Sequence, residues 1–401
     1  MTGQQQQQQS SRLNDPGVTR LRSFGDSIFG SMSARAMELG AINLGQGFPD
    51  SDGPASMLER AQEEMASGNN QYAPVQGLPE LREAVARHQG RYGLHVDPDT
   101  EVLVTVGATE AITATILGLV EPGQEVIVLE PYFDSYVAAI ALAGAQRVAV
   151  PLREVQCGDG RAWDVDLEAL RAAVTEKTAM IVVNSPHNPT GSVLSREGLE
   201  GIAELARDRD LFVLSDEVYE HLVFSGHEHV CCASLPGMWE RTITVSSAAK
   251  SFNATGWKTG WAVAPENLLR HVLKAKQFLT YVGVTPVQPA VAQALDTELS
   301  WVEDMSARLE EKVRKVATAL EECGLDAYVS HGTYYVIARI PERFKDDVEF
   351  CRFLVEEVGV AAIPVSAFSD HTEQWKRFVR FACCKRDEVL DQAIERLKGA
   401  M

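Results

Sequence analysis

Six short runs of apolar residues between residues 101 and 247 constrain the fold of this chain more than any other feature. The runs are rich in Val, Ile and Leu, and they occupy residues 101–106, 125–130, 147–152, 179–184, 211–215 and 242–247. Most of them are separated by stretches typical of helices, at residues 107–120, 135–145, 166–174 and 197–209. Apolar strands that alternate with helices indicate a mostly parallel sheet that is covered on both faces. The sequence therefore predicts an α/β fold.

The rest of the chain predicts a second, smaller unit, since 401 residues exceed what one hydrophobic core usually spans. After Pro286 the pattern changes to a long helical stretch and then to mixed strands and helices, at residues 294–324, 334–340, 347–359, 378–384 and 387–399. Strands with helices on one side indicate an α+β domain. We expect four segments: a disordered tail (1–20), an N-terminal arm that forms part of the small domain (21–55), a large domain (56–290) and a small C-terminal domain (291–401).

Composition excludes several classes of partner. The chain has 37 Lys and Arg against 56 Asp and Glu, and this net charge of −19 should repel nucleic acid and anionic membranes. It has no apolar run of about 18 residues, the length that spans a membrane. The start, MTGQQQQQQSS, lacks the features of a secretory signal and is typical of disorder. Seven scattered cysteines without CxxC spacing indicate reduced thiols, no zinc site and a cytoplasmic protein.

Ligands of open α/β sheets bind at the carboxyl ends of the strands, so the residues after each run are candidates for a site. Gly107, Ala108 and Thr109 follow the first run and open a helix, where backbone N–H groups and a hydroxyl can hold a phosphate. A plain tight turn explains these residues equally well. Phe133 follows the second run, where an aromatic ring either packs in the core or stacks on a flat ligand.

Polar side chains follow two further runs. Asn188 lies in SPHNPTG, where it is either a turn residue or an amide donor to a ligand. Asp216 ends the next strand, and a buried carboxylate there requires a cationic partner unless it caps a helix. Tyr219 comes three residues later, one predicted helical turn away, and can reach the same place.

Lys250 follows the last run, three residues after Ser247, in the stretch SSAAKSFNATGWKTGW. A lysine in a loop is normally solvated, but this one shares a sheet edge with a phosphate site, an aromatic ring, an amide and a buried carboxylate. Lysine is the side chain that forms a Schiff base with an aldehyde. Phosphate, flat ring, phenolic oxygen, ring nitrogen and aldehyde are the groups of pyridoxal 5'-phosphate, which we therefore predict as the cofactor.

Asn188-Pro-Thr-Gly, Asp216-x-x-Tyr219 and Ser247-x-x-Lys250, in this order, resemble the motifs of the class I aminotransferases, which are fold type I enzymes that use pyridoxal phosphate. The resemblance runs from about Phe24 to the end of the chain. NLGQGFPD and NQYAPVQGLPELREA look like the kynurenine and methionine aminotransferase branch, and the whole chain resembles the actinobacterial N-succinyldiaminopimelate aminotransferases. The resemblance implies a mostly parallel central sheet flanked by helices, plus a smaller α+β domain.

The resemblance also implies roles in binding the cofactor. Lys250 would bind its aldehyde and later move the proton at the substrate Cα, and Asp216 would pair with its ring nitrogen. Asn188 and Tyr219 would donate to the ring oxygen, with Tyr219 also lowering the pKa of the Schiff base, and Phe133 would stack on the ring. The phosphate set implied by the resemblance is Ala108, Thr109, Ser247 and Lys258, joined by Tyr72 of a neighbouring subunit in a homodimer.

For the substrate, the resemblance implies contacts with Gly47 through its backbone, with Asn188 and with Arg380. Arg380 lies in the apolar run FVRFACC, where an unpaired guanidinium is costly and a bidentate substrate carboxylate relieves the cost. A structural ion pair is the alternative. A second arginine, frequent in relatives with dicarboxylate substrates, cannot be identified. Phe29 stands near a position where relatives carry a bulky aromatic residue over the substrate.

We therefore expect a ping-pong aminotransferase that moves an amino group from an amino acid, with glutamate as the expected donor, to a 2-oxo acid. The acceptor implied by the resemblance is the succinylated precursor of diaminopimelate in lysine biosynthesis. The alternatives on the same fold are a kynurenine, methionine or aromatic aminotransferase of broad specificity and a cysteine-S-conjugate β-lyase. A non-catalytic regulator is disfavoured, because it would need a DNA-binding extension and this chain is strongly acidic.

Overall fold

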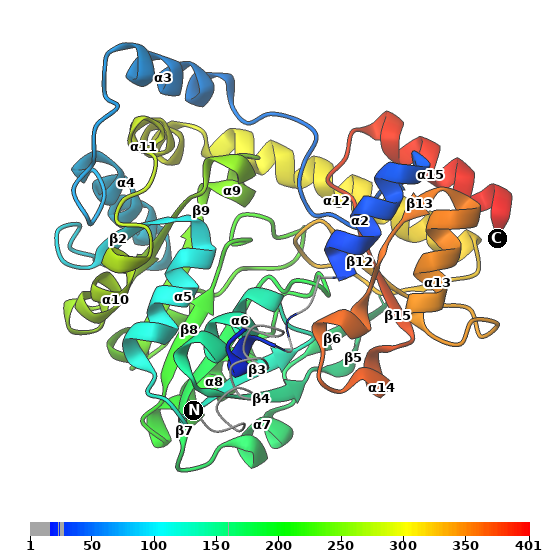
Figure 1. Ribbon diagram of the computed structural model, residues 1–401, viewed down its shortest axis with the longest axis horizontal. Coiled ribbons are helices and arrows are strands. Elements are labelled where there is room, and N and C mark those ends of the chain that lie inside the picture. The colour runs from blue at the N-terminus through cyan, green and yellow to red at the C-terminus, as the bar shows by residue number, and fades with distance from the viewer. Residues whose placement is uncertain (1–16, 23, 25–27, 159) are drawn as a thin grey trace, which may run out of the picture.

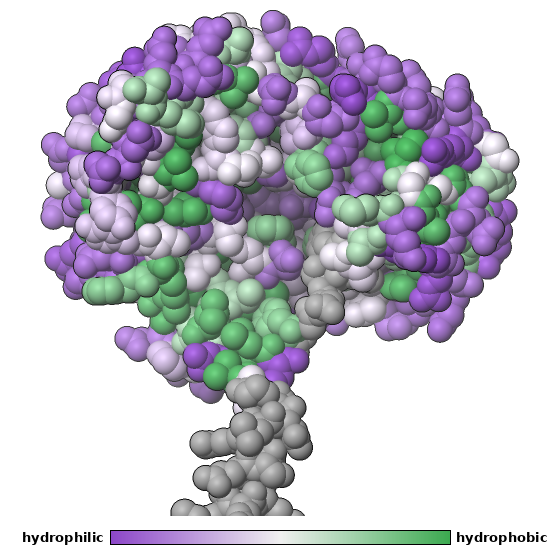
Figure 2. All heavy atoms as spheres, turned by 45° about the horizontal axis from the view of Figure 1, so that its top comes forward, coloured by the Kyte–Doolittle hydropathy of each residue, from purple (hydrophilic) through white to green (hydrophobic). Residues whose placement is uncertain are grey.

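The computed structural model describes residues 17–22, 24, 28–158 and 160–401. The predicted disordered tail, residues 1–20, falls outside these ranges up to position 16. Among the described residues, no helix is both long and apolar enough to cross a membrane. Figure 2 shows hydrophilic residues around the rim of one face, which is hollowed near its middle.

A seven-stranded sheet forms the centre of the larger part of the molecule (Figure 1). Its strands lie in the order β2-β10-β9-β8-β7-β3-β4. Their bounds are β2 (Val102–Val106), β3 (Glu125–Glu130), β4 (Gln146–Pro151), β7 (Thr178–Asn184), β8 (Phe212–Asp216), β9 (Thr242–Ser247) and β10 (Thr259–Val263). β10 is antiparallel to both of its neighbours, and the other pairs are parallel. The predicted mostly parallel sheet is confirmed.

Helices cover both faces of this sheet, because alternate residues of each strand point to opposite sides. On one face Val126 and Val128 share a core with helices α5 (Gly107–Leu119), α6 (Asp134–Ala143) and α10 (Glu266–Leu279). On the other face Ile127 and Leu129 share a core with α7 (Leu167–Ala173) and α8 (Arg196–Asp208). Burial on both sides explains why the strands are apolar throughout.

The antiparallel strand β10 was not among the predicted strands. Gly260 interrupts its apolar pattern, and glycine inside a strand often marks a close approach of another backbone. A Cβ on Gly260 would lie 2.6 Å from the carbonyl carbon of Gly107, so only a glycine lets β10 pass this close to the start of α5. The close approach places Lys258, the residue before β10, beside the carboxyl end of β2.

A four-stranded antiparallel sheet forms the centre of the smaller part. In order its strands are β11 (Asp326–Ala327), β12 (Tyr335–Arg339), β15 (Phe378–Ala382) and β14 (Ile363–Pro364). Helices α12 (Leu299–Glu322), α13 (Asp347–Phe353) and α15 (Asp387–Ala400) pack beside it, as do α2 (Ile28–Leu39) and β1 (Ile42–Asn43), since β1 pairs with β13 (Val360–Ala361) (Figure 1). The predicted α+β unit is confirmed, and its boundary near residue 290 stays a prediction.

Three further details differ from the predicted elements. The stretch 294–324 is not one helix but α11 (Gln288–Thr297) and α12, because Glu298 leaves the helical conformation at φ −111° and ψ 18°. The helix predicted at 347–359 is α13 followed by a π-helical turn, η7 (Leu354–Val358). A hairpin of β5 (Arg153–Cys157) and β6 (Gly160–Asp164) was not predicted.

The remaining elements are shorter or lie outside the two sheets. The 3-10 turns are η1 (Thr19–Leu21), η2 (Gly90–Tyr92), η3 (Cys232–Ser234), η4 (Trp239–Arg241), η5 (Thr255–Trp257), η6 (Thr285–Val287) and η8 (Val365–Phe368). The other helices are α3 (Ala55–Ala66), α4 (Pro79–Gln89), α9 (Ala248–Ser251) and α14 (Thr372–Trp375). Of these helices, α9 begins directly after β9, and α4 contacts the turn that follows β8 through His88 and His221.

Candidate active site

The carboxyl ends of the central strands open into one cavity of about 360 Å³. All but one of the predicted site residues line it, namely Gly47, Ala108, Thr109, Phe133, Asn188, Asp216, Tyr219, Ser247, Lys250, Lys258 and Arg380. Tyr72 does not, because its side chain is exposed and lies against the ring of Tyr281, with centroids 5.4 Å apart. Its predicted contact with a neighbouring subunit stays a prediction. The side chain of Phe29 lies outside the described residues.

Asp216 is the last residue of β8, and its carboxylate is almost completely buried at one side of the cavity. The hydroxyl of Tyr136 donates to one carboxylate oxygen at 2.6 Å, and the backbone N–H of Val218 donates to the other at 3.3 Å. Burial raises the pKa of Asp216 to about 6, although both donors oppose the rise. A cation placed against this carboxylate would restore its ionised form.

Residues 217–220 form a turn rather than the helical turn that was predicted after Asp216. Asp216 accepts a bond from the N–H two residues later, which is an Asx-type turn and not a helix cap. The turn still brings Tyr219 into the cavity, where its hydroxyl lies 3.1 Å from the hydroxyl of Tyr335. Burial raises the pKa of Tyr219 well above its usual range, so the phenol stays protonated and can donate.

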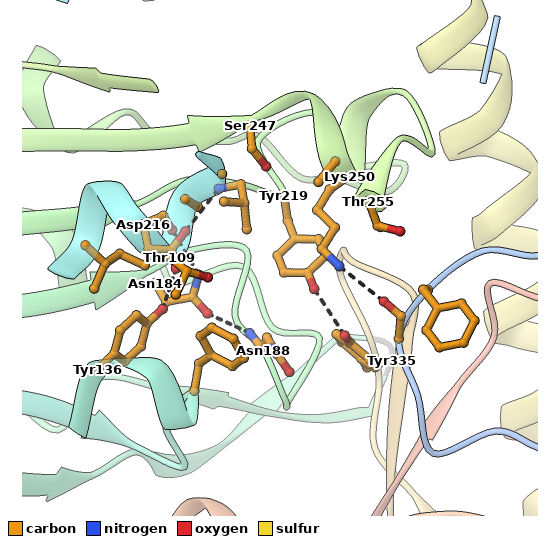
Figure 3. Close-up of a pocket in the computed structure, with 18 of the residues that line it drawn as sticks. Thr109, Tyr136, Asn184, Asn188, Asp216, Tyr219, Ser247, Lys250, Thr255 and Tyr335 are labelled. Carbon is orange, nitrogen blue, oxygen red and sulfur yellow. Dashed lines mark hydrogen bonds between the residues drawn. The ribbon is translucent and has the colours of Figure 1, made fainter. Parts of the chain in front are cut away.

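Lys250 lies in the short helix α9, on the opposite side of the cavity from Asp216 (Figure 3). Its ammonium donates to the hydroxyl of Tyr334 at 2.8 Å and to the carbonyl of Gly47 at 3.1 Å. Tyr334 donates to the same carbonyl at 2.7 Å. A Cβ on Gly47 would lie 2.0 Å from the Tyr335 hydroxyl, so the segment that contains Gly47 can approach the lysine only with a glycine there.

A small-residue cradle lies where α5 begins, at the carboxyl end of β2. Gly107 has φ +71°, and a Cβ on it would lie 3.1 Å from the Lys258 ammonium. Lys258 itself adopts the left-handed conformation, with φ 52°, which is uncommon for a residue with a side chain. The backbone N–H groups at the start of α5 and the ammonium of Lys258 therefore converge on one space, which Ala108, Thr109 and Ser247 also line.

Arg380 enters the cavity from β15 of the smaller sheet. Its guanidinium donates to the side-chain oxygen of Asn188 at 2.9 Å and to the carbonyl of Gly45 at 2.7 Å. It also lies over the ring of Tyr335, 4.2 Å from the centroid. These contacts fix the direction of the guanidinium along one wall, and they join Asn188, in the loop after β7, to the segment before Gly47.

The prediction omitted several lining residues. Asn184 is the last residue of β7 and donates to the backbone carbonyl of Asp216 at 2.9 Å, and Tyr136 lies one helical turn after Phe133. The sequence could have indicated both: Asn184 is the final residue of a predicted apolar run, and Tyr136 lies one helical turn after the predicted site residue Phe133. Tyr335 opens β12 of the other sheet and lines the cavity, and Tyr334, the residue before it, accepts from Lys250. No local pattern connects either tyrosine with that lysine. Their position is decided by the packing of the two sheets.

Comparisons with known proteins agree with this geometry. Residues 40–397 match the family model described as aminotransferase class I and II. The chain belongs to this family. The solved structure of N-succinyldiaminopimelate aminotransferase from Mycobacterium tuberculosis is similar to the aminotransferase described here, with a TM-score of 0.93 and 52% identity over 96% of this chain and 100% of that one.

Two more distant relatives have other named activities. The methionine aminotransferase of Escherichia coli is 38% identical to this aminotransferase over 389 residues, which are 96% of this chain and 99% of that protein. Kynurenine–oxoglutarate transaminase 3 of Rattus norvegicus is 36% identical over 409 residues, which are 96% of this chain and 90% of that protein. The predicted resemblance to aminotransferases and the fold type are therefore confirmed.

Proposed function

We propose that this aminotransferase uses pyridoxal 5'-phosphate to transfer an amino group from glutamate to the succinylated 2-oxo acid precursor of diaminopimelate, in lysine biosynthesis. The observation that carries the proposal is the 52% identity to the Mycobacterium tuberculosis enzyme across nearly the whole of both chains. The cysteines of the chain described here are free thiols, which suits an enzyme of the reducing cytoplasm.

The residues of the cavity fit the cofactor. Asp216 offers a buried carboxylate that a ring N–H⁺ would keep ionised, and Tyr136 and Val218 hold that carboxylate in one orientation. Gly107 leaves room beside the Lys258 ammonium, where a phosphate would meet the N-terminus of α5, and Gly260 lets β10 pass close to that terminus. The Lys250 amine lies across the cavity from Asp216. When bound, pyridoxal phosphate supplies an aldehyde that accepts the amino group and a ring that withdraws electrons from the substrate Cα.

Each residue then has a defined task. Lys250, released from the Tyr334 hydroxyl and the Gly47 carbonyl, takes the proton from the substrate Cα and gives it back later in the amino transfer. Tyr334 keeps its own bond to Gly47, so the segment stays in place while the lysine moves. Tyr219 and Asn188 supply donors near the centre of the cavity. Arg380 binds the substrate α-carboxylate and orients the Cα–H bond toward Lys250.

We also propose that the active enzyme is a homodimer. Tyr72, Phe278, Tyr281 and Val284 are large apolar residues with between 44% and 84% of their surface exposed. Exposed apolar residues gathered in this way indicate an interface. The Tyr72–Tyr281 ring contact joins two of them. The family resemblance implies that Tyr72 would then reach the cavity of the second copy. A single species at twice 43.9 kDa in light scattering is the expected result.

The alternatives differ in substrate rather than in architecture. The 36% and 38% relatives favour a broad kynurenine, methionine or aromatic aminotransferase as the second candidate. A cysteine-S-conjugate β-lyase remains the third, and it would release ammonia and a 2-oxo acid in place of a new amino acid. The lining cations among the described residues are Lys250, Lys258 and Arg380, so a second substrate carboxylate would need a cation from outside this set.

A panel of 2-oxo acids and amino donors, ranked by kcat/KM, tests the proposal. Glutamate should convert the cofactor and bleach its visible band, and the succinylated 2-oxo acid should then restore that band faster than the 2-oxo acids of methionine or kynurenine. Faster turnover of the latter would assign the broad-specificity function. Release of ammonia from cysteine conjugates, without a new amino acid, would assign the lyase.

A further inference from the structure

A largely buried cluster of metal-ligating side chains lies outside the catalytic cavity, since none of its three residues lines that cavity. His88 belongs to α4, and Glu220 and His221 belong to the turn that follows β8. One ligand atom from each residue lies within 4.8 Å of the other two. The Nε2 atoms of His88 and His221 lie 2.9 Å apart, and a Glu220 oxygen lies 3.8 Å from the His88 Nε2. Two imidazoles and one carboxylate form a common ligand set for a divalent transition metal.

Outer hydrogen bonds hold two of the three ligands in place. The hydroxyl of Tyr92 donates to one oxygen of Glu220 at 2.6 Å, and Ser246 donates to the other. The Nδ1 of His221 lies 2.7 Å from the Ser251 hydroxyl, which leaves Nε2 facing the cluster. A ligating histidine that is oriented through its second nitrogen is the usual arrangement in metal sites. The Nδ1 of His88 has no hydrogen-bond partner among the described residues, so no contact there dictates its tautomer.

Another ring near the cluster has a partner of its own. His229 pairs with Glu217 at 2.7 Å, so it is not counted in the ligand set. Metal ions bind the neutral imidazole and the ionised carboxylate.

We propose that His88, Glu220 and His221 bind one divalent late transition-metal ion, of the Ni²⁺, Cu²⁺ or Zn²⁺ class. At bond lengths of about 2.0–2.1 Å, two nitrogens 2.9 Å apart subtend close to a right angle at the ion. That angle is the one between neighbouring ligands in octahedral or square sites, and a tetrahedral site needs the rings a few tenths of an ångström further apart. The Glu220 oxygen, 3.8 Å from the His88 Nε2 and within 4.8 Å of a His221 nitrogen, has to move inward to complete the set.

An entry path and a competitor both lie on the solvent side of the cluster. Glu220, His221 and Tyr92 line a cavity of about 340 Å³, large enough for water ligands. Arg91, at the same cavity, points one nitrogen at the His88 Nε2 from 3.1 Å. Arg91 is exposed, so its guanidinium can leave when an ion arrives. Its charge and its hydrogen bond weaken ion binding until then, and its removal should strengthen it.

The site is connected to the catalytic cavity through chain neighbours. Glu220 directly follows Tyr219, and Ser251, the partner of His221, directly follows Lys250. Ser246 directly precedes Ser247. Successive residues here alternate between the cavity and the cluster. An ion that draws Glu220 and His221 together therefore stiffens the two loops that carry Tyr219 and Lys250.

The test uses untagged enzyme loaded with pyridoxal phosphate and free of amino acid. Ni²⁺ is titrated by calorimetry, and Co²⁺ serves as an optical probe of geometry. One ion per chain is expected. His88→Gln and His221→Gln should each weaken binding by at least about 10-fold, while Arg91→Gln should tighten it. His227→Asn is the matched control, because His227 lines the same cavity but lies outside the ligand set. This variant should bind the ion with the affinity of the wild type.

Two outcomes would overturn the site. The first is absence of stoichiometric binding by wild type whose cofactor band is intact, which leaves the 2.9 Å contact as a hydrogen bond between two rings that share one proton. The second is equal affinity in wild type, His88→Gln and His221→Gln. If the buried variants fail to fold, the exposed Arg91→Gln still decides, because unchanged affinity there contradicts the geometry. The outcome is independent of which 2-oxo acid the enzyme uses.

Discussion

Replacement of Asp216 by Asn measures the free-energy cost of burying the one carboxylate that the cofactor is expected to pair with. Burial raises the pKa of Asp216 from 3.8 to about 6. At 1.36 kcal/mol for each tenfold change in proton affinity, this rise corresponds to about 3 kcal/mol. The folded state binds more protons than the unfolded state between these two pKa values. The stability of the apoenzyme therefore falls as pH rises through this window.

The amide of the Asp216→Asn variant does not titrate, so the difference in unfolding free energy between this variant and wild type follows the charge of Asp216 alone. In the variant, the side-chain oxygen can still accept from Val218, and the side-chain amide can donate to the Tyr136 hydroxyl. Any fixed cost of the substitution is the same at every pH. The difference should move in favour of the variant by about 2 kcal/mol between pH 4.5 and 7.5, which is the part of the 3 kcal/mol that falls in this range.

Urea unfolding of both apoenzymes at a series of pH values measures this difference. Added pyridoxal phosphate should then stabilise wild type more than the variant, because its ring N–H⁺ finds a carboxylate only in wild type, and the variant should lose most of its transaminase activity. A difference in unfolding free energy that stays flat from pH 4.5 to 7.5 would refute the assignment of a buried, titrating Asp216. Equal stabilisation of both proteins by the cofactor would refute its pairing with the ring.

Three further predictions concern neighbouring residues. Lys250→Ala should keep the cofactor but lose about 100- to 10,000-fold in turnover, whereas Lys258→Ala should weaken cofactor retention and recover turnover at saturating cofactor; the reverse pattern in dialysis and steady-state assays would exchange their roles. Arg380→Lys should raise KM for every 2-oxo acid by about 10-fold or more, since an ammonium cannot bind a carboxylate in two places, and an unchanged KM would point to a structural arginine. Tyr136→Phe removes a donor that lowers the pKa of Asp216, so that pKa should rise above 6. In urea unfolding, the stability of the apoenzyme should then keep falling to a higher pH than in wild type.

The site was largely predictable because its residues follow one rule of local sequence. Asn188, Asp216 and Lys250 each come just after an apolar run, and the ends of parallel strands meet at one edge of the sheet. The nature of each side chain then limited the chemistry to an aldehyde, a ring nitrogen and a phosphate. The sequence by itself thus determined the sheet and its edge, and it predicts the chemical class of the cofactor.

Tertiary structure decided which residues far apart in the chain contact each other around the site. Tyr334 bonds Lys250 across 84 residues of chain, and the rings of His88 and His221 meet across 133. β10 enters the sheet only because Gly260 tolerates the backbone of Gly107. Such contacts depend on how whole layers pack, and no period or spacing within one segment records them. A local pattern fixes which face of an element is buried, but the partner that it meets there is set by the rest of the fold.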